Sequence, residues 1–360
     1  GIGKAIGTIE KEEEIFIGHD NRQGSLAINV YVKQGLVAVG KKVLDLGLVP
    51  IMVPAFASYE EHKSAIEITA SHNPAKYTGI LIYKNGTTVT PEKIKETYES
   101  GKFQIGKGAY EDVDFTSRYV NYIAKSVPSL PLKIGIDSMG GATTYVAKQL
   151  LESAGSDVKM LHATWDSGFY GKIPEPKEEN TKELSKLVKD NGLDFGAQLD
   201  GDGDRVAFVD EKGQHLGVMT TAMIFIKYLN FKNVLATVAC SQKLKSFANV
   251  TYSKIGRPYM EKQMQDGKFD FGIETSSHIY FGGYYPFSDG LLAVVLMAKI
   301  LYENNTKLSE LKKEFPEVFF REFSIPLPTD LERENMLKQI EAKAEKYGEV
   351  DKTDGIKVIM

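Results

Sequence analysis

Short apolar segments alternate with longer amphipathic segments along most of this chain, and this alternation is typical of α/β folds. The pattern starts three times, each time with an apolar strand, a polar turn and a helical segment. We expect strands at 14–17, 42–46, 133–137 and 234–238, and helices at 25–40, 142–153 and 289–303. The last helix is strongly apolar, which predicts that it is buried. The sequence therefore predicts three similar α/β units in succession.

The composition limits the class of protein. A chain of 360 residues exceeds one ordinary hydrophobic core, so we expect two or more domains. The net charge of -4, with both signs mixed, leaves no basic footprint for nucleic acid and no membrane-binding patch. No apolar run is long enough to span a membrane, and no signal peptide is visible. The single cysteine, Cys240, excludes internal disulfides and suits the cytoplasm, where we expect the protein.

A serine lies in a polar turn directly after an apolar strand. The strand is Ala65–Ile68, and the turn places Ser71 beside His72 and two residues after Thr69. Ligands bind at strand ends of α/β sheets, because side chains there leave the packed layer while the scaffold holds them still. Ser71 could therefore carry a phosphoryl group. The alternative is a turn whose hydroxyls only satisfy backbone donors.

An acidic loop follows another buried strand. Asp200, Asp202 and Asp204 alternate with glycines, so the backbone can fold around one hard cation such as Mg²⁺, Mn²⁺ or Ca²⁺. The spacing imitates a helix–loop–helix calcium site, but that site needs glycine where Arg205 stands, and β-branched residues follow instead. The alternative is a solvated acidic hairpin. We favour a metal site, because three close carboxylates repel one another without a counter-ion.

A third polar loop combines an acid, hydroxyls and an imidazole. Glu274 can accept hydrogen bonds from two neighbouring sugar hydroxyls, and Ser276 and His278 can bond a third or move a proton. A polar loop with a structural histidine is an equally good interpretation of this segment alone. Nucleophilic Ser-His-Asp catalysis is a poor competitor, because no serine lies in a Gly-x-Ser-x-Gly elbow.

Arginine is rare in this chain, and half of the arginines fall near these loops. Of six arginines, Arg22, Arg205 and Arg257 lie in candidate loops, where a planar guanidinium can hold phosphate through two hydrogen bonds. Chance placement or ion pairing remains an alternative for Arg257. The pattern favours a phosphorylated ligand.

The three loops, in this order, resemble those of the α-D-phosphohexomutase family of phosphoglucomutases and phosphomannomutases. Further agreement comes from the segments at 18–22, 174–176 and 255–259. The resemblance implies three consecutive similar α/β domains with mixed sheets around a central cleft, plus the start of a fourth α+β domain. The implied domains are a phosphoserine domain at 1–128, a metal-binding domain at 129–230, a sugar-binding domain at 231–325 and a partial C-terminal phosphate-binding domain at 326–360.

The resemblance also implies a reaction, the interconversion of hexose 1-phosphate and hexose 6-phosphate through a phosphoserine and a hexose 1,6-bisphosphate. Mg²⁺ would be held at the acidic loop, sugar phosphates would be the small-molecule partners, and the charge that accumulates would be offset by metal and arginine. The implied catalytic residues are Ser71, His72, Arg22 and His278; the implied substrate-binding residues are Arg205, Glu274, Ser276 and Arg257; the implied metal ligands are Ser71, Asp200, Asp202 and Asp204.

The chain departs from the family pattern in three places. Leu81 stands where the family usually has a lysine that serves the chemistry, and Lys84 falls on the opposite face of the strand. Ser277 replaces a usual glycine, and the distal-phosphate loop of the fourth domain is absent from the printed sequence. Two alternatives therefore stay open: a phosphoglucosamine mutase, and a truncated or impaired paralogue that only binds sugar phosphates. No oligomeric state is predicted.

Overall fold

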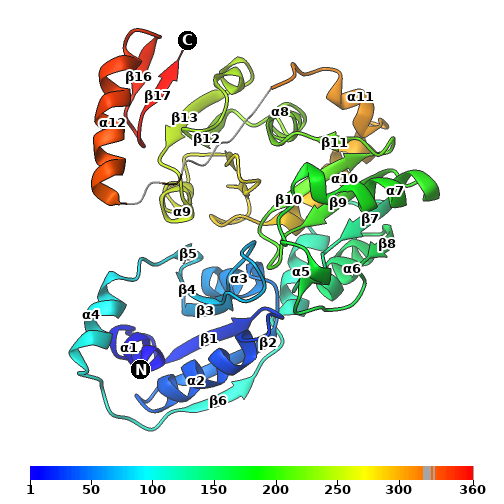
Figure 1. Ribbon diagram of the computed structural model, residues 1–360. Helices are drawn as coiled ribbons and strands as arrows, with labels where there is room; N and C mark the ends of the chain where they lie inside the picture. The colour runs from blue at the N-terminus through cyan, green and yellow to red at the C-terminus, as the bar shows by residue number, and fades with distance from the viewer. Residues whose placement is uncertain (319–325, 327–328, 360) are drawn as a thin grey trace.

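The computed structural model describes residues 1–318, 326 and 329–359 and contains three α/β units in chain order (Figure 1). The first unit comprises α1 (Ile2–Ile9), β1 (Glu14–His19), α2 (Ser25–Val37), β2 (Lys42–Leu48), α3 (Met52–Glu61), β3 (Ser64–Thr69), β4 (Gly79–Lys84), β5 (Thr87–Thr88), α4 (Glu92–Ser100), β6 (Ala109–Asp112) and α5 (Thr116–Ala124). The second comprises β7 (Lys133–Asp137), α6 (Thr144–Ser153), β8 (Asp157–Leu161), α7 (Lys182–Asn191), β9 (Phe195–Leu199), β10 (Val206–Asp210), β11 (His215–Leu216) and α8 (Val218–Tyr228).

The third unit is followed by a small C-terminal group of elements. The third unit comprises β12 (Asn233–Thr237), β13 (Asn249–Ser253), α9 (Arg257–Gln265), β14 (Phe271–Ile273), β15 (Ile279–Phe281), α10 (Gly290–Glu303) and α11 (Leu308–Lys312). The C-terminal group comprises α12 (Asp330–Ala344), β16 (Glu349–Asp351) and β17 (Lys357–Ile359). The expected domain boundary after residue 325 lies outside the described residues.

Each of the three large sheets has a parallel centre and an antiparallel edge, as expected for mixed sheets. The strand orders are β5-β4-β3-β1-β2-β6, β11-β10-β9-β7-β8 and β13-β12-β14-β15. The antiparallel partners are β4 on β3, β10 on β9 and β15 on β14. The loops that follow β3 and β9, and the loop that joins β14 to β15, carry the polar residues predicted from the sequence. The same local design therefore occurs in all three units.

The alternation of side chains in β3 places Glu67 and Thr69 on the same face of the strand. Ile66 and Ile68 join the core beneath α1 and α2, whereas Ala65 joins the core that contains α3. Because successive side chains of a strand point to opposite faces, Glu67 and Thr69 lie on the α3 side with Ala65. The loop after β9 also meets the start of α3, where the Ile51 amide donates to the Asp202 carbonyl at 3.1 Å.

A buried acid joins elements of different units. Asp289 precedes α10 and caps it by accepting from the Leu292 amide at 2.8 Å. Its other oxygen accepts from the hydroxyls of Tyr119 on α5 and Tyr285, at 2.8 and 2.7 Å. The next residue, Gly290, donates its amide to the Gly203 carbonyl in the acidic loop at 3.1 Å. As predicted, α10 is almost entirely buried, and it packs against β9 and β10 of the second unit.

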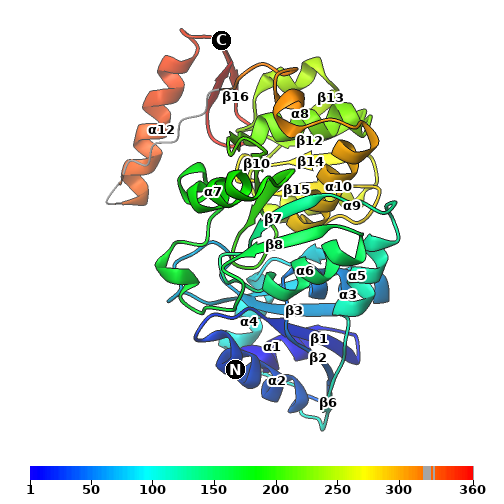
Figure 2. The ribbon, with the colours of Figure 1, turned by 90° about the vertical axis from the view of Figure 1, so that its right-hand side faces the viewer.

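The C-terminal elements dock beside the third sheet (Figures 1 and 2). Lys357 on β17 donates its ammonium to the Val238 carbonyl at 2.6 Å, and Asp354 accepts from the Ile255 amide at 2.8 Å. Among the described residues, no helix is both long and apolar enough to cross a membrane.

Two predicted helices are shorter than expected. The helix expected at 25–40 ends at Val37, and Gly40 adopts φ +91°, a conformation that an α-helix cannot contain. The helix expected from residue 142 begins at Thr144. The residues before it form a turn, in which the Gly141 carbonyl accepts from the Thr144 amide and hydroxyl. Both differences are confined to helix ends.

Candidate active site

The predicted serine and the predicted acidic loop meet. Ser71 follows the end of β3 by two residues, and its hydroxyl donates to the Asp200 carboxylate at 2.7 Å. These residues are 129 positions apart in the sequence. The Thr69 hydroxyl makes a second link, donating to Asp202 at 2.9 Å and accepting from the Ser71 amide at 3.0 Å. Ser71 itself adopts φ 48°, in the left-handed region that most side chains avoid.

The acidic loop is buried and tightly folded. Asp200, Asp202 and Asp204 are at most 1% exposed, and one carboxylate oxygen from each lies within 4.8 Å of the others. The intervening glycines are required by space: a Cβ on Gly201 would lie 2.7 Å from the Ser71 carbonyl oxygen. A Cβ on Gly203, whose φ is +95°, would lie 2.2 Å from the Thr143 methyl group. The loop is therefore no solvated hairpin.

The charges of this loop are only partly compensated. Burial and the neighbouring Asp200 carboxylate raise the pKa of Asp202 to about 7. One oxygen of Asp202 and both oxygens of Asp204 are buried with no hydrogen-bond partner among the described residues, although Asp204 forms an ion pair with Arg257. Because a buried, unpaired carboxylate is costly, the set fits a hard divalent cation, which takes oxygen ligands. The three carboxylates are the residues that would hold it.

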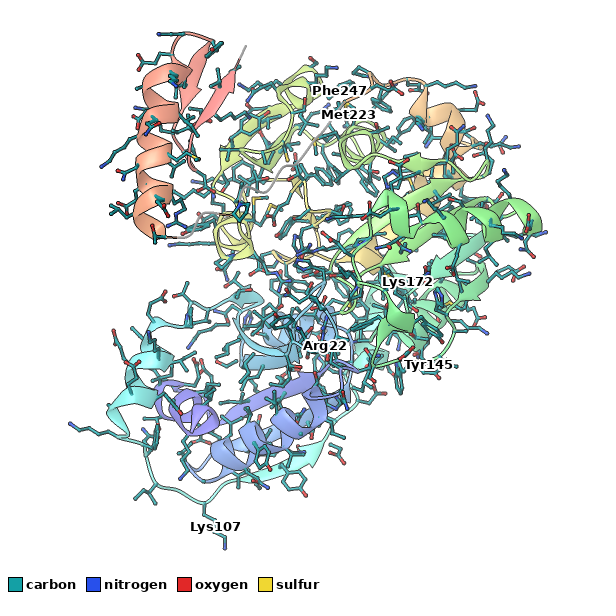
Figure 3. All side chains as sticks on the ribbon, viewed as in Figure 1. Arg22, Lys107, Tyr145, Lys172, Met223 and Phe247 are labelled. Carbon is teal, nitrogen blue, oxygen red and sulfur yellow. The ribbon has the colours of Figure 1, made fainter. Side chains whose placement is uncertain are left out.

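Arg22 holds the serine loop from behind. Its guanidinium donates to the carbonyls of Ser71, Pro74 and Tyr77, the last two at 2.9 and 3.2 Å. Its Nε pairs with Asp20 at 2.9 Å, and both side chains are fully buried. Figure 3 shows Arg22 where the first unit faces the second. Arg22, predicted to be catalytic, thus binds the backbone of the loop that carries Ser71.

The third predicted loop approaches the acidic loop through His278. The Arg205 Nε donates to His278 Nε2 at 3.2 Å, so the imidazole proton resides on Nδ1, within 2.9 Å of the Ser276 hydroxyl. Burial and the Arg205 guanidinium lower the pKa of His278 well below its usual range, which keeps the ring neutral. Glu274 accepts from the Tyr280 hydroxyl. Ser277 adopts φ 71°, a conformation that favours glycine.

Two further predicted residues lie at the same place. The guanidinium of Arg257 pairs with Asp204 and donates to the Tyr83 hydroxyl at 2.9 Å. His72 is half-buried, and burial together with the Arg205 guanidinium lowers its pKa. The predicted site residues thus come from four loops and one helix start, which lie together around the serine and acidic loops.

The sequence analysis did not single out three residues that contribute to the candidate site. Thr69 precedes Ser71 by two residues, and Tyr280 supports Glu274; only the alternation of a strand could have indicated either one. Glu67 is the third, with both carboxylate oxygens buried and without hydrogen-bond partners among the described residues. Burial and the Asp20 and Asp202 carboxylates raise the pKa of Glu67 well above its usual range. An acid inside an otherwise apolar strand was the available signal.

The lysine expected from the family is absent from the site. Leu81 lies opposite Glu67 in the β3–β4 ladder and packs against the α3 core. Lys84 lies on the other face of β4, as predicted, and pairs with Glu10 and Glu12 at 3.1 and 3.2 Å. No lysine from β4 therefore reaches the serine loop.

Known proteins and protein-family descriptions match this chain over nearly its whole length. Residues 1–104, 114–213 and 212–319 match the descriptions "Phosphoglucomutase/phosphomannomutase, alpha/beta/alpha domain I", "domain II" and "domain III". A "Phosphoglucomutase/phosphomannomutase" from Thermococcus kodakarensis is 29% identical over 99% of this chain and 84% of its own length. A "Probable phosphoglucosamine mutase" from Methanosarcina barkeri is 30% identical over 100% of this chain and 85% of its own.

A solved structure gives the same picture. The "Phosphoglucomutase/phosphomannomutase family protein" from Burkholderia thailandensis superposes with a TM-score of 0.87 at 25% identity, covering 99% of this chain and 82% of its own. The agreement therefore extends over all three units and the C-terminal group.

Proposed function

This chain belongs to the phosphoglucomutase/phosphomannomutase family, the α-D-phosphohexomutases, and from that membership we propose that it interconverts hexose 1-phosphate and hexose 6-phosphate. The proposed route passes through a phosphoserine at Ser71 and a hexose 1,6-bisphosphate. The observation that carries the proposal is the 2.7 Å hydrogen bond from the Ser71 hydroxyl to Asp200. This hydrogen bond supports the proposal because it joins the Ser71 hydroxyl to the three carboxylates that, among the described residues, could hold a metal ion.

We propose that Asp200, Asp202 and Asp204 hold Mg²⁺ together with an oxygen at Ser71. The ion, when bound, supplies positive charge that stabilises the phosphoryl group during transfer. Among the residues of the chain, Arg205 lies beside this loop, with its Nε 3.8 Å from Asp200 and 3.9 Å from Asp204. It is the side chain best placed to contact the transferred phosphate.

The serine must be free to receive and return a phosphoryl group without moving its loop. Arg22 and Thr69 hold the backbone on both sides of Ser71, so the reacting oxygen is positioned before substrate arrives. In the unphosphorylated form, Asp200 accepts a hydrogen bond from the Ser71 hydroxyl. Asp200 is therefore a candidate for taking up the hydroxyl proton when the serine reacts. His72 and His278, both with lowered pKa values, are further candidates for proton transfer.

The sugar is proposed to bind at the third loop. Glu274 is fixed by Tyr280 and has acceptor capacity for sugar hydroxyls, while Ser276 is held by His278. Arg257 is proposed to contact the substrate's phosphate. The relatives include proteins named for glucose, mannose and glucosamine substrates, so the proposal covers hexose phosphates as a class.

Phosphorylation of the resting protein is the direct test. Intact-mass analysis of the purified protein should detect one phosphate, which the Ser71→Ala variant lacks and the matched surface variant Ser100→Ala retains. Coupled assays with glucose 1-phosphate, mannose 1-phosphate and glucosamine 1-phosphate should show turnover that Ser71→Ala abolishes. Phosphate on the Ser71→Ala protein would refute the assignment.

A second candidate function, sugar-phosphate binding without turnover, is favoured by Leu81, since no lysine of β4 reaches the serine. A protein of that kind would bind hexose phosphates while carrying no phosphate and giving no turnover with any of the three sugars. The same two measurements therefore separate the two functions.

A further inference from the structure

Arg257 crosses from the third unit into the acidic loop of the second. It is the first residue of α9 and follows Gly256. Its Nη1 donates to the Tyr83 hydroxyl on β4 of the first unit at 2.9 Å, and its Nη2 pairs with the Asp204 carboxylate. One guanidinium thereby joins elements of all three units. The Arg257 and Asp204 side chains are 13% and 1% exposed, so solvent screens this pair little.

The pair occupies a carboxylate that the proposed metal site needs. The oxygen of Asp204 that contacts Arg257 also lies 3.4 Å from His278 Nε2, and the other oxygen of Asp204 has no hydrogen bond among the described residues. A divalent ion held by three carboxylates would share Asp204 with the guanidinium. Two cations a few ångströms apart in a buried site repel each other strongly, so a divalent ion at Asp204 would weaken the contact between this carboxylate and the guanidinium.

We propose that Arg257 is the resident counter-cation of Asp204 and that a divalent ion binding to the acidic loop displaces it, which frees its guanidinium for the substrate's phosphate. This inference rests on the proposed metal site. It makes metal binding a condition for Arg257 to reach the substrate, so that the metal binds before the sugar phosphate. It also explains how one arginine can serve the metal-free protein and the substrate complex.

A second contact would hold α9 in place once Arg257 has released Asp204. Glu261, one turn along the helix, accepts from the Thr88 amide on β5 at 2.6 Å and lies 3.8 Å from the Arg257 Nε. Because Thr88 donates through its backbone, this link does not depend on the arginine. The released guanidinium therefore stays within the site, where its planar fork can bind phosphate through two hydrogen bonds.

Mn²⁺ binding, measured calorimetrically on the full chain without substrate, tests the displacement. The Arg257→Gln variant should bind Mn²⁺ about 10-fold more tightly than the wild type, because the ion no longer competes with a guanidinium. Tyr83→Phe, which removes a contact of Arg257 but leaves the acidic loop intact, should tighten binding by a smaller factor. The matched control Lys262→Gln removes an exposed positive charge from the same helix and should change the affinity less than twofold.

Hydrogen exchange separates displacement from a general charge effect. In the wild type, Mn²⁺ should speed amide exchange in the first turn of α9, and in Arg257→Gln it should leave that exchange unchanged. Equal or weaker Mn²⁺ binding by Arg257→Gln, or unchanged exchange in the wild type, would overturn the displacement alone. A wild-type protein that binds no Mn²⁺ would instead overturn the proposed metal site on which the inference rests.

Discussion

Asp289 and Asp202 are both fully buried, yet the protein surrounds them in opposite ways. Three donors satisfy Asp289: the Tyr119 and Tyr285 hydroxyls and the amide of Leu292. Asp202 accepts from Thr69, but its other oxygen has no hydrogen-bond partner among the described residues, and other carboxylates face it. Burial raises the pKa of both acids.

The difference is the reason why we expect Asp289 to stabilise the fold and propose that Asp202 binds a ligand. A satisfied carboxylate stabilises the elements that donate to it, and Asp289 joins α5 to the start of α10 in this way. An unsatisfied one costs stability, so a folded protein keeps it only where something else compensates. Burial alone does not distinguish the two. The partners do.

The largest expected effect is on catalysis. Asp202→Asn should reduce kcat/KM by about 1,000-fold, since it removes a proposed metal ligand, while the stability of the metal-free protein should not fall. Coupled assays and urea unfolding in EDTA measure the two effects, with Asp289→Asn as the matched control. Substantial activity in Asp202→Asn, or a clear loss of its stability, would contradict the contrast.

Asp289→Ala should have the opposite outcome. Removing the carboxylate leaves two buried tyrosine hydroxyls and a helix cap without a partner, at a cost of about 3 kcal/mol in the free energy of unfolding. Urea unfolding measures this loss, and Tyr285→Phe, which removes one donor, should lose less. The folded fraction should keep most of its activity. A stable but inactive Asp289→Ala protein would place Asp289 in the chemistry.

The pH dependence of stability should differ between wild type and Asp202→Asn. The pKa of Asp202 is raised in the folded state to about 7, so the folded protein holds this proton more tightly than the unfolded chain. The stabilisation is therefore complete below the ordinary aspartate pKa and is lost as the pH rises through about 7. For one group the slope is at most about 1.4 kcal/mol per pH unit.

Unfolding in EDTA at several pH values between 5 and 8 provides the measurement. Buried acids remote from Asp202, such as Asp289, contribute to both proteins alike, so the difference between the two curves reports Asp202 together with the acids that it influences, Asp200 and Glu67. Wild-type and Asp202→Asn curves that run parallel over this range would show that the unpaired acid does not retain its proton.

The smallest expected effect is at Thr69. Thr69→Val removes the hydroxyl that links Asp202 to the Ser71 amide, which should cost about 1 kcal/mol of stability and slow turnover about 10-fold. Thr69→Ser keeps a hydroxyl and should restore both. If Thr69→Val turned over as fast as wild type, the acidic loop would hold its position without the serine loop.

Much of this arrangement could be predicted from local sequence. Strand, glycine and acid patterns placed Ser71 and the acidic loop at strand ends, and three repeated α/β units followed from hydrophobic periodicity. The contact between Ser71 and Asp200 could be expected only from the family resemblance, because residues 129 apart carry no local signal of proximity. The same holds for Arg257 and Asp204, whose contact depends on how the third unit sits against the second.

Thr69 and Tyr280 could not be predicted as site residues, because residues of these types are common at such positions. A threonine in a strand and a tyrosine after a loop occur for packing reasons in most proteins, so Thr69 and Tyr280 give no distinct signal. Glu67 was different, since an acid in an apolar strand contradicts the pattern around it, and such contradictions tend to mark functional sites. Helix ends were the least predictable part of the fold.

The left-handed backbone of Ser71 has a consequence for how this position tolerates change. A non-glycine residue there bears a steric penalty of about 1 kcal/mol, so folding by itself would prefer glycine at residue 71. Ser71→Gly would relieve this penalty but would also remove the hydrogen bond to Asp200, so its stability should stay close to that of the wild type while its activity is lost. The serine at this position therefore brings the fold little net stability, and what it supplies there is a hydroxyl in contact with Asp200.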